Sequence, residues 1–161
     1  MTSSDKQLTT CLWFDGRALE AARFYADLFG GSVDGDPTDY PEGGMGEAGE
    51  PMTVGFEILG QRFVGLNGGP MFTFNEAISF QIPCADQQEV DHYWDALTAD
   101  GGAESQCGWC KDRFGVSWQV VPTALPAMFS GDPAKAAAVN KAMMPMRKLD
   151  IATLQAAYDG A

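Results

Sequence analysis

Histidine is nearly absent from this sequence, which contains only His92 among its 161 residues. Catalytic arrangements that activate a serine or cysteine with a histidine need that base beside the nucleophile. His92 falls instead in a segment with helical spacing, next to Asp91, where a solvent-exposed position is the simplest interpretation. The sequence therefore argues against a serine or cysteine hydrolase and against a histidine-rich metal site.

Positive charge is also scarce, with 10 Lys and Arg against 22 Asp and Glu and a formal net charge of −12. Such a surface repels phosphate backbones and anionic lipids, so we expect no nucleic-acid partner and no membrane partner. No apolar run approaches the roughly 20 residues that cross a bilayer. Residues 1–10 are polar and lack the features of a secretory signal, which predicts a cytoplasmic protein.

Cysteine occurs four times, and two of the four form a Cys-x-x-Cys sequence, Cys107 to Cys110. This spacing is found in redox pairs and in zinc sites. A zinc site would need a second pair, but Cys11 and Cys84 lie far apart in the sequence. A redox pair typically begins a helix, whereas this one lies in a strand-like run, so we interpret it as ordinary packing.

The order of predicted elements repeats along the chain. A strand, a helix and two further strands are predicted at residues 8–14, 18–29, 52–59 and 62–66, with a hairpin at Gly60-Gln61. The same order returns at residues 78–82, 86–99, 104–110 and 116–121. Both helices carry an acid, an aromatic pair, a leucine and a closing double glycine. An internal repeat of two strand–helix–strand units explains this match.

Three aspartates are predicted to begin helices. Asp86 precedes the second repeat helix, Asp132 precedes a proline, and Asp150 precedes a last helical segment, which are the sequence features of N-caps. The two helices that follow Pro122 lie outside the repeat, and we expect them to cover one module or a partner subunit.

Several segments together resemble one known family. They are Cys11-Leu-Trp-Phe-Asp-Gly16, Leu66-Asn-Gly-Gly69, Cys107-Gly-Trp109 and Lys111-Asp-Arg-Phe-Gly-Val-Ser-Trp-Gln-Val-Val-Pro122. They resemble the PhnB-like, demethylubiquinone methyltransferase-like family of the vicinal oxygen chelate (glyoxalase/bleomycin-resistance) superfamily. The resemblance implies an α+β fold of two paired βαβββ modules that form half-open sheets around a cavity. We assign residues 1–74 and 75–125 to the modules and 126–161 to a C-terminal helical extension.

The resemblance also implies a homodimer, for which Met143, Met144 and Met146 offer an apolar contact. Metal-dependent members of the superfamily hold a divalent ion with His and Glu side chains from four strand positions. The corresponding positions here are neutral: Thr9 or Thr10, Phe63 or Asn67, Ser79 and Gln119. Gln119 is a poor ligand for a catalytic divalent ion. We therefore expect neither a metal nor another cofactor.

Aromatic and amide side chains on the predicted strands are typical of a pocket for a small planar ligand. The expected cavity-lining residues are Trp13, Phe63, Asn67, Ser79, Gln81, Trp109 and Gln119. Because side chains alternate along a strand, Trp118 and Gln119 must face opposite sides. The leading hypothesis is a metal-independent small-molecule-binding protein whose ligand is unidentified.

Two other functions remain open, a lyase or isomerase of the same superfamily and a drug-sequestering resistance protein, so whether the protein is an enzyme stays undecided. The methyltransferase name of the family is not supported by the sequence. Methyl transfer from S-adenosylmethionine usually implies a doubly wound nucleoside-binding domain, and the repeat is a different architecture.

Overall fold

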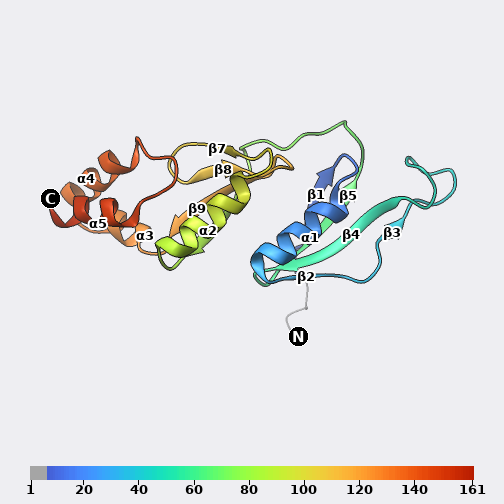
Figure 1. The fold of residues 1–161 in the computed structure, drawn as a ribbon, viewed down its shortest axis with the longest axis horizontal. Helices are drawn as coiled ribbons and strands as arrows, with labels where there is room; N and C mark the ends of the chain where they lie inside the picture. Colours follow the sequence, from blue (N-terminus) through green and yellow to red (C-terminus); the bar gives the residue numbers. More distant parts are fainter. Residues whose placement is uncertain (1–6) are drawn as a thin grey trace, which may run out of the picture. The chain divides into compact units, whose positions relative to one another are not determined.

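The computed structural model describes residues 7–161, so the first six residues of the segment that bears on localisation lie outside it. The chain divides into two compact units, Met1–Thr73 and Phe74–Ala161 (Figure 1). Each unit contains one sheet with a helix on it. No helix among the described residues is long and apolar enough to cross a bilayer.

The first unit is a mixed sheet covered by one helix. Its elements are β1 (Thr10–Phe14), α1 (Ala18–Phe29), β2 (Ser32–Val33), β3 (Thr38–Asp39), β4 (Pro51–Ile58) and β5 (Gln61–Asn67). The strand order is β1-β5-β4-β2, with β3 also paired to β4. β1 runs parallel to β5, and the other pairs are antiparallel.

The second unit repeats this topology and adds three helices. Its elements are β6 (Phe80–Cys84), α2 (Gln87–Thr98), β7 (Ala103–Glu104), β8 (Trp109–Lys111), β9 (Ser117–Pro122), α3 (Leu125–Ser130), α4 (Pro133–Met143) and α5 (Ile151–Asp159). The strand order is β6-β9-β8-β7, with β6 parallel to β9. The predicted α+β fold with two βαβββ modules is therefore confirmed, and neither sheet of the described chain closes into a barrel.

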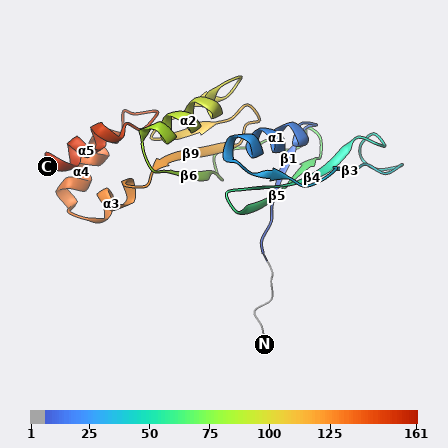
Figure 2. The ribbon, with the colours of Figure 1, turned by 60° about the horizontal axis from the view of Figure 1, so that its bottom comes forward.

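Each helix covers one face of its sheet, and the burial of side chains follows from that. Tyr25 of α1 and Trp94 of α2 hold equivalent places in the repeat and are 0% and 1% exposed. Along β9, Trp118 and Val120 are buried while Gln119 is half-exposed, as strand alternation requires. Figure 2 shows α2 on one side of the sheet that contains β6 and β9.

The predicted helix starts are confirmed. The carboxylate of Asp86 accepts a hydrogen bond from Glu89 N, that of Asp132 from Ala134 N, and that of Asp150 from Thr153 N. These bonds satisfy backbone donors that would otherwise lack a partner in the first helical turn.

Two strand predictions were wrong in detail. The β4–β5 hairpin turns at Leu59 and Gly60, both with positive φ, and not at Gly60-Gln61. The predicted strand 104–110 is divided into β7 and β8 by a turn at Cys107 and Gly108, which also have positive φ. The backbone N–H groups of that turn donate to the carbonyl oxygens of Met146 and Arg147, 2.8 and 2.7 Å away. The C-terminal segment therefore takes hydrogen bonds that a continuous strand would have used.

The C-terminal helices cover the end of the second module. Their buried side chains form a small apolar cluster against Val121 of β9, made of Leu125, Met128, Val139, Leu149 and Leu154. The amide of Gln87 holds the same segment, because its Nε2 donates to Leu149 O at 3.1 Å and its Oε1 accepts from Ile151 N at 2.9 Å. This part of the chain thus packs on the module that precedes it.

The packing of the C-terminal helices buries part of the methionine cluster that was expected to contact a second subunit. Met143 and Met146 lie partly buried against the C-terminal cluster, whereas Met144 is 57% exposed. The homodimer remains a prediction, with Met144 as the exposed member of the methionine cluster. Static light scattering at micromolar concentration should give twice the chain mass of 17.3 kDa. A mass of one chain would contradict it.

A buried carboxylate organises the turn between β8 and β9. Asp112 is 2% exposed, and its Oδ1 accepts from Phe114 N at 2.8 Å and from Val116 N at 3.1 Å. Its Oδ2 accepts from the indole Nε1 of Trp118 at 2.8 Å. One side chain thereby fixes the turn and holds Trp118 on the helix-covered face of the sheet.

We predict that Asp112→Asn lowers the free energy of unfolding by about 1–3 kcal/mol, because an amide N–H would face the indole N–H of Trp118 or a backbone N–H. Asp86→Asn is the matched control, since asparagine is as good an N-cap as aspartate. Urea denaturation of both variants provides the measurement. Equal stability of the two variants would contradict a structural role for the Asp112 charge.

Candidate functional site

The face of the second sheet that α2 leaves open presents a row of polar and aromatic side chains across three strands. Gln81 of β6 is paired with Gln119 of β9, and Gln119 is paired with Trp109 of β8. Ser79 lies just before β6. Four residues that the sequence predicted as cavity-lining therefore lie together on one face.

Hydrogen bonds link three members of this row, Ser79, Gln81 and Gln119. Gln119 Nε2 donates to Ser79 Oγ at 2.8 Å, and Gln81 Nε2 donates to Gln119 Oε1 at 3.3 Å. Both ends of the Gln119 amide are thus engaged by neutral partners. The arrangement fixes the side chain at the centre of the open face. We call Ser79, Gln81, Trp109 and Gln119 the polar row.

A charged pair borders the polar row on one side. Lys111 follows Trp109 by two residues, so it lies on the same face, and its Nζ is 2.5 Å from Glu76 Oε1. Ser117 Oγ donates to Asn75 O at 3.3 Å, so the segment before β6 covers this part of the sheet. A hollow of about 180 Å³ lies here and includes Trp109, Lys111 and Ser117 in its lining.

An apolar hollow borders the polar row on the other side. It measures about 270 Å³ and is lined by Gln81, Pro83, Val121, Pro122, Thr123 and Pro126. The polar row thus lies between a charged hollow and an apolar one. Proline and valine surfaces beside amide groups suit a ligand with an apolar body and few polar atoms.

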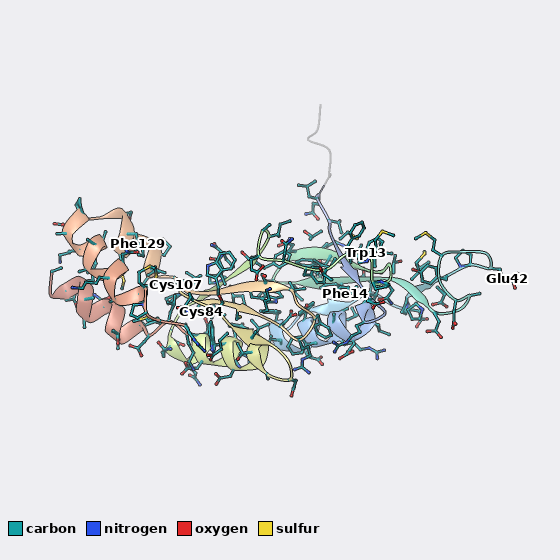
Figure 3. The ribbon with its side chains drawn as sticks, turned by 90° about the horizontal axis from the view of Figure 1, so that it is seen from above. Trp13, Phe14, Glu42, Cys84, Cys107 and Phe129 are labelled. Carbon is teal, nitrogen blue, oxygen red and sulfur yellow. The ribbon has the colours of Figure 1, made fainter. Side chains whose placement is uncertain are left out.

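The three other predicted lining residues lie in the first unit and have different environments. Trp13 is on the open face of its sheet, where its Nε1 donates to Gly69 O at 2.8 Å and its ring contacts Phe72 edge-on at 4.9 Å. Figure 3 labels Trp13 and Phe14, adjacent residues that point to opposite sides of β1.

Phe63 does not lie on an open face, contrary to the prediction. It is 2% exposed and stacks on Phe56 with ring centroids 5.1 Å apart, under α1. The pairing of Phe63 with Thr10 and of Gly65 with Leu12 assigns it to the buried side of β5. Phe63 is a core residue.

Asn67 links backbone segments of the first unit. Its Oδ1 accepts from Ala18 N at the start of α1, and its Nδ2 donates to Pro51 O, both at 2.9 Å. Its carbonyl oxygen accepts from the hydroxyl of Tyr40. Because both ends of the amide are used internally, Asn67 shapes the nearby surface but offers a ligand little hydrogen-bonding capacity.

A larger hollow in the first unit lies beside Asn67. It measures about 520 Å³, and its lining includes Tyr40, Asp15, Glu47 and Glu50. The sequence did not predict Tyr40, because it lies in an irregular loop whose path depends on pairing between Tyr40 and Glu50. Lys111 was also missed, although its two-residue spacing from Trp109 already placed it on the same face.

The residues at the positions that the resemblance implies for a metal do not suit a divalent ion. In the second unit Ser79 and Gln119 offer a hydroxyl and an amide, and in the first unit Thr9 or Thr10 and Phe63 or Asn67 add neither a carboxylate nor an imidazole, the ligands that replace the hydration of such ions. Lys111 adds a positive charge to the same face. Among residues 7–161, no three His, Cys, Asp or Glu side chains are grouped so that they could hold a metal.

The Cys-x-x-Cys sequence is poorly suited to redox chemistry. Cys110 is 1% exposed, and burial, reinforced by the charge of Asp112, raises the pKa of its thiol to about 12. Cys107 lies in the preceding turn near the carbonyl oxygen of Met143. A redox pair needs a reactive thiolate at neutral pH, and Cys110 does not provide one.

The repeated βαβββ units, each with one helix-covered and one open sheet face, define the fold of the vicinal oxygen chelate superfamily. A family model described as 3-demethylubiquinone-9 3-methyltransferase matches residues 6–121. The chain belongs to this PhnB-like family.

Solved structures agree with this assignment. A PhnB protein from Bacillus cereus, named for 3-demethylubiquinone-9 3-methyltransferase, is 31% identical, with 73% of this chain and 99% of that chain covered and a TM-score of 0.64. A protein from Pseudomonas aeruginosa is 21% identical over 73% of this chain and 98% of its own, with a TM-score of 0.59.

A fosfomycin resistance protein, FosX from Listeria monocytogenes, is 14% identical over 74% of this chain and 93% of its own, with a TM-score of 0.50. It shares the fold alone. A comparison with curated proteins finds no match.

We predict that Cys84 and Cys110 resist alkylation in the native protein. Burial raises the pKa of Cys84 to about 11 and that of Cys110 to about 12, so each thiolate is rare at pH 7 and also inaccessible. Cys11 is exposed and should react first. Mass spectrometry of timed iodoacetamide labelling, with Cys11→Ser as control, measures this order. Rapid labelling of Cys110 before unfolding would restore the redox interpretation.

Proposed function

We propose that this protein binds a small organic molecule on the open face of its second sheet and does so without a divalent metal. The observation that carries the proposal is the hydrogen-bonded polar row, in which the Gln119 amide bonds to Ser79 and Gln81. Amide and hydroxyl groups beside a tryptophan and an apolar hollow are the chemistry of a neutral organic ligand.

The fold does not decide between metal-dependent and metal-independent chemistry. FosX is described in complex with Mn(II) and a dihydroxypropylphosphonic acid, but one fold supports many functions, and function depends on the residues of the site. Gln119 occupies the position where a carboxylate would be needed. Its Oε1 already accepts a hydrogen bond from Gln81, and the nearby Lys111 opposes a second positive charge.

The methyltransferase name of the family receives no support from the architecture. Nucleoside cofactors commonly bind where the strand order reverses in an open parallel sheet. Each sheet of this chain has one parallel pair flanked by antiparallel strands. We therefore propose binding as the function, with methyl transfer excluded from it.

A lyase or isomerase remains the alternative, because Lys111 and Glu76 border the polar row and both are ionisable. Their mutual ion pair lowers the pKa of Glu76, chiefly through the hydrogen bond from Lys111. A carboxyl held in its charged form is a weak general acid at neutral pH. A sequestering role, in which a ligand is held without reaction, fits the polar row equally well.

The proposal predicts that Zn²⁺, Ni²⁺ and Mn²⁺ leave the melting temperature of the dialysed protein unchanged, since an ion that binds only the folded state would raise it.

The proposal also predicts that planar organic compounds found by ligand-observed NMR lose affinity about fivefold to tenfold in Gln119→Leu, because the change removes hydrogen bonds worth about 1–1.4 kcal/mol.

Gln61→Leu is the control, since Gln61 is another glutamine on a strand, and its exposed side chain also donates from Nε2, to Thr10 Oγ1 at 3.1 Å. One tightly held ion per chain that is lost in both Ser79→Ala and Gln119→Leu would overturn the metal-independent role.

A further inference from the structure

The polar row has a direction that its internal hydrogen bonds define. Gln81 donates an N–H to Gln119, and Gln119 donates an N–H to Ser79, so both bonds run in the same direction along the row. Ser79 accepts at the end of the row, which leaves its hydroxyl hydrogen available to another acceptor. Gln81 donates at the start, which leaves its own carbonyl oxygen available to another donor. The two ends of the row therefore differ in hydrogen-bonding character.

The tryptophan beside the row adds a second donor. Trp109 is paired with Gln119 across β8 and β9, and within the described chain no residue hydrogen-bonds its indole N–H. The amide nitrogen of Gln119 also keeps one hydrogen beyond the one given to Ser79. Donors thus predominate around Ser79, Gln119 and Trp109, and the acceptor is at Gln81.

The charge around the row favours a neutral ligand over an ion. Lys111 is the cation on this face, and it is held by Glu76 at 2.5 Å. An incoming anion would have to compete with Glu76 for it and would approach a chain of net charge −12. An incoming cation would meet Lys111 and three groups that offer mainly N–H and O–H donors.

The apolar surface next to Gln81 favours an apolar body for the rest of the ligand. Pro83, Val121 and Pro126 line the hollow of about 270 Å³ that Gln81 borders. Flat proline and valine surfaces fit the faces of a ring system and provide no hydrogen bonds.

From this arrangement we infer that the ligand is a neutral, planar ring compound carrying a carbonyl oxygen and an N–H or O–H group, as a lactam does. The carbonyl oxygen accepts from the remaining N–H of Gln119, which Ser79 orients, and the N–H or O–H group donates to Oε1 of the adjacent Gln81. This inference rests on the proposed function and specifies the ligand class for the same site.

Four bicyclic probes of similar size separate the contributions. Carbostyril carries a carbonyl and an N–H, its N-methyl derivative keeps only the carbonyl, naphthalene has neither, and naphthoate is an anion. Ligand-observed NMR titration should give the tightest binding for carbostyril, with a loss on the order of tenfold on N-methylation, as expected for one hydrogen bond.

Two variants test which residue recognises which group. In Gln81→Ala the preference for carbostyril over its N-methyl derivative should disappear, because the acceptor is gone. In Ser79→Ala both compounds should weaken by a similar factor, so the preference should persist. Such coupling between a ligand group and a side chain isolates their interaction. Gln81 is exposed and Ser79 half-exposed, so neither change disturbs the core, and Gln61→Ala is the control.

The outcomes for the inference and for the proposed function are distinct. Naphthalene and carbostyril could bind equally well and both lose binding in Trp109→Ala and Gln119→Leu. This result supports the proposed function and overturns the lactam-type ligand. Naphthoate as the tightest probe also overturns it, in favour of an anion. A preference for carbostyril that survives Gln81→Ala overturns the assigned orientation. If none of the four probes binds, the inference is overturned. The proposed function is then tested separately, by comparing compounds from the NMR screen on the unchanged protein and on Gln119→Leu.

Discussion

The buried carboxylate of Asp112 is the group on which the polar row of the second unit depends. Hydrogen bonds to it from Phe114 N, Val116 N and the indole of Trp118 close the turn before β9 and hold that indole beneath α2. Because side chains alternate along a strand, fixing Trp118 inward also fixes Gln119 outward. The parallel pairing with β6 then aligns Gln81 with Gln119. The buried carboxylate in the turn thus determines which residues lie on the open face of the sheet.

Much of this arrangement could be predicted from the sequence, since it follows from short-range rules. The helix starts at Asp86, Asp132 and Asp150 depend on local capping, and the opposite facing of Trp118 and Gln119 depends on alternation alone. The repeat of acid, aromatic pair, leucine and double glycine identified the two modules. Each of these signals lies within one element, so no tertiary contact was needed to detect it.

The errors arose where a distant contact or an unusual backbone conformation decided the structure. Leu59 adopts a positive φ, which side chains other than glycine rarely do, and so the hairpin turn was placed one residue too late. Cys107 and Gly108 form a turn because the segment at Met146 and Arg147 accepts their N–H groups, and nothing in residues 104–110 indicates this partner. Phe63 was assigned to the wrong face because the register between β1 and β5 could not be inferred from either strand alone.

The two sheets differ at equivalent positions, and the difference falls in the polar row. β1 pairs with β5 over five residues, and β6 pairs with β9 over five residues in the same parallel sense. In this correspondence Gln81 matches Cys11, and Gln119 matches Val64. In the second sheet the two positions therefore carry amides that hydrogen-bond to each other. In the first sheet they carry a thiol, Cys11, and an aliphatic side chain, Val64.

A purely structural role would require no such polarity, since the first sheet forms the same fold without it. Exposed strand positions tolerate amides, but a connected row that includes both Gln81 and Gln119 orders two flexible side chains at an entropic cost. The single hydrogen bond between the two amides, at 3.3 Å, contributes little in water. This cost supports the proposal that the row serves a ligand, because the row adds little to the stability of the sheet.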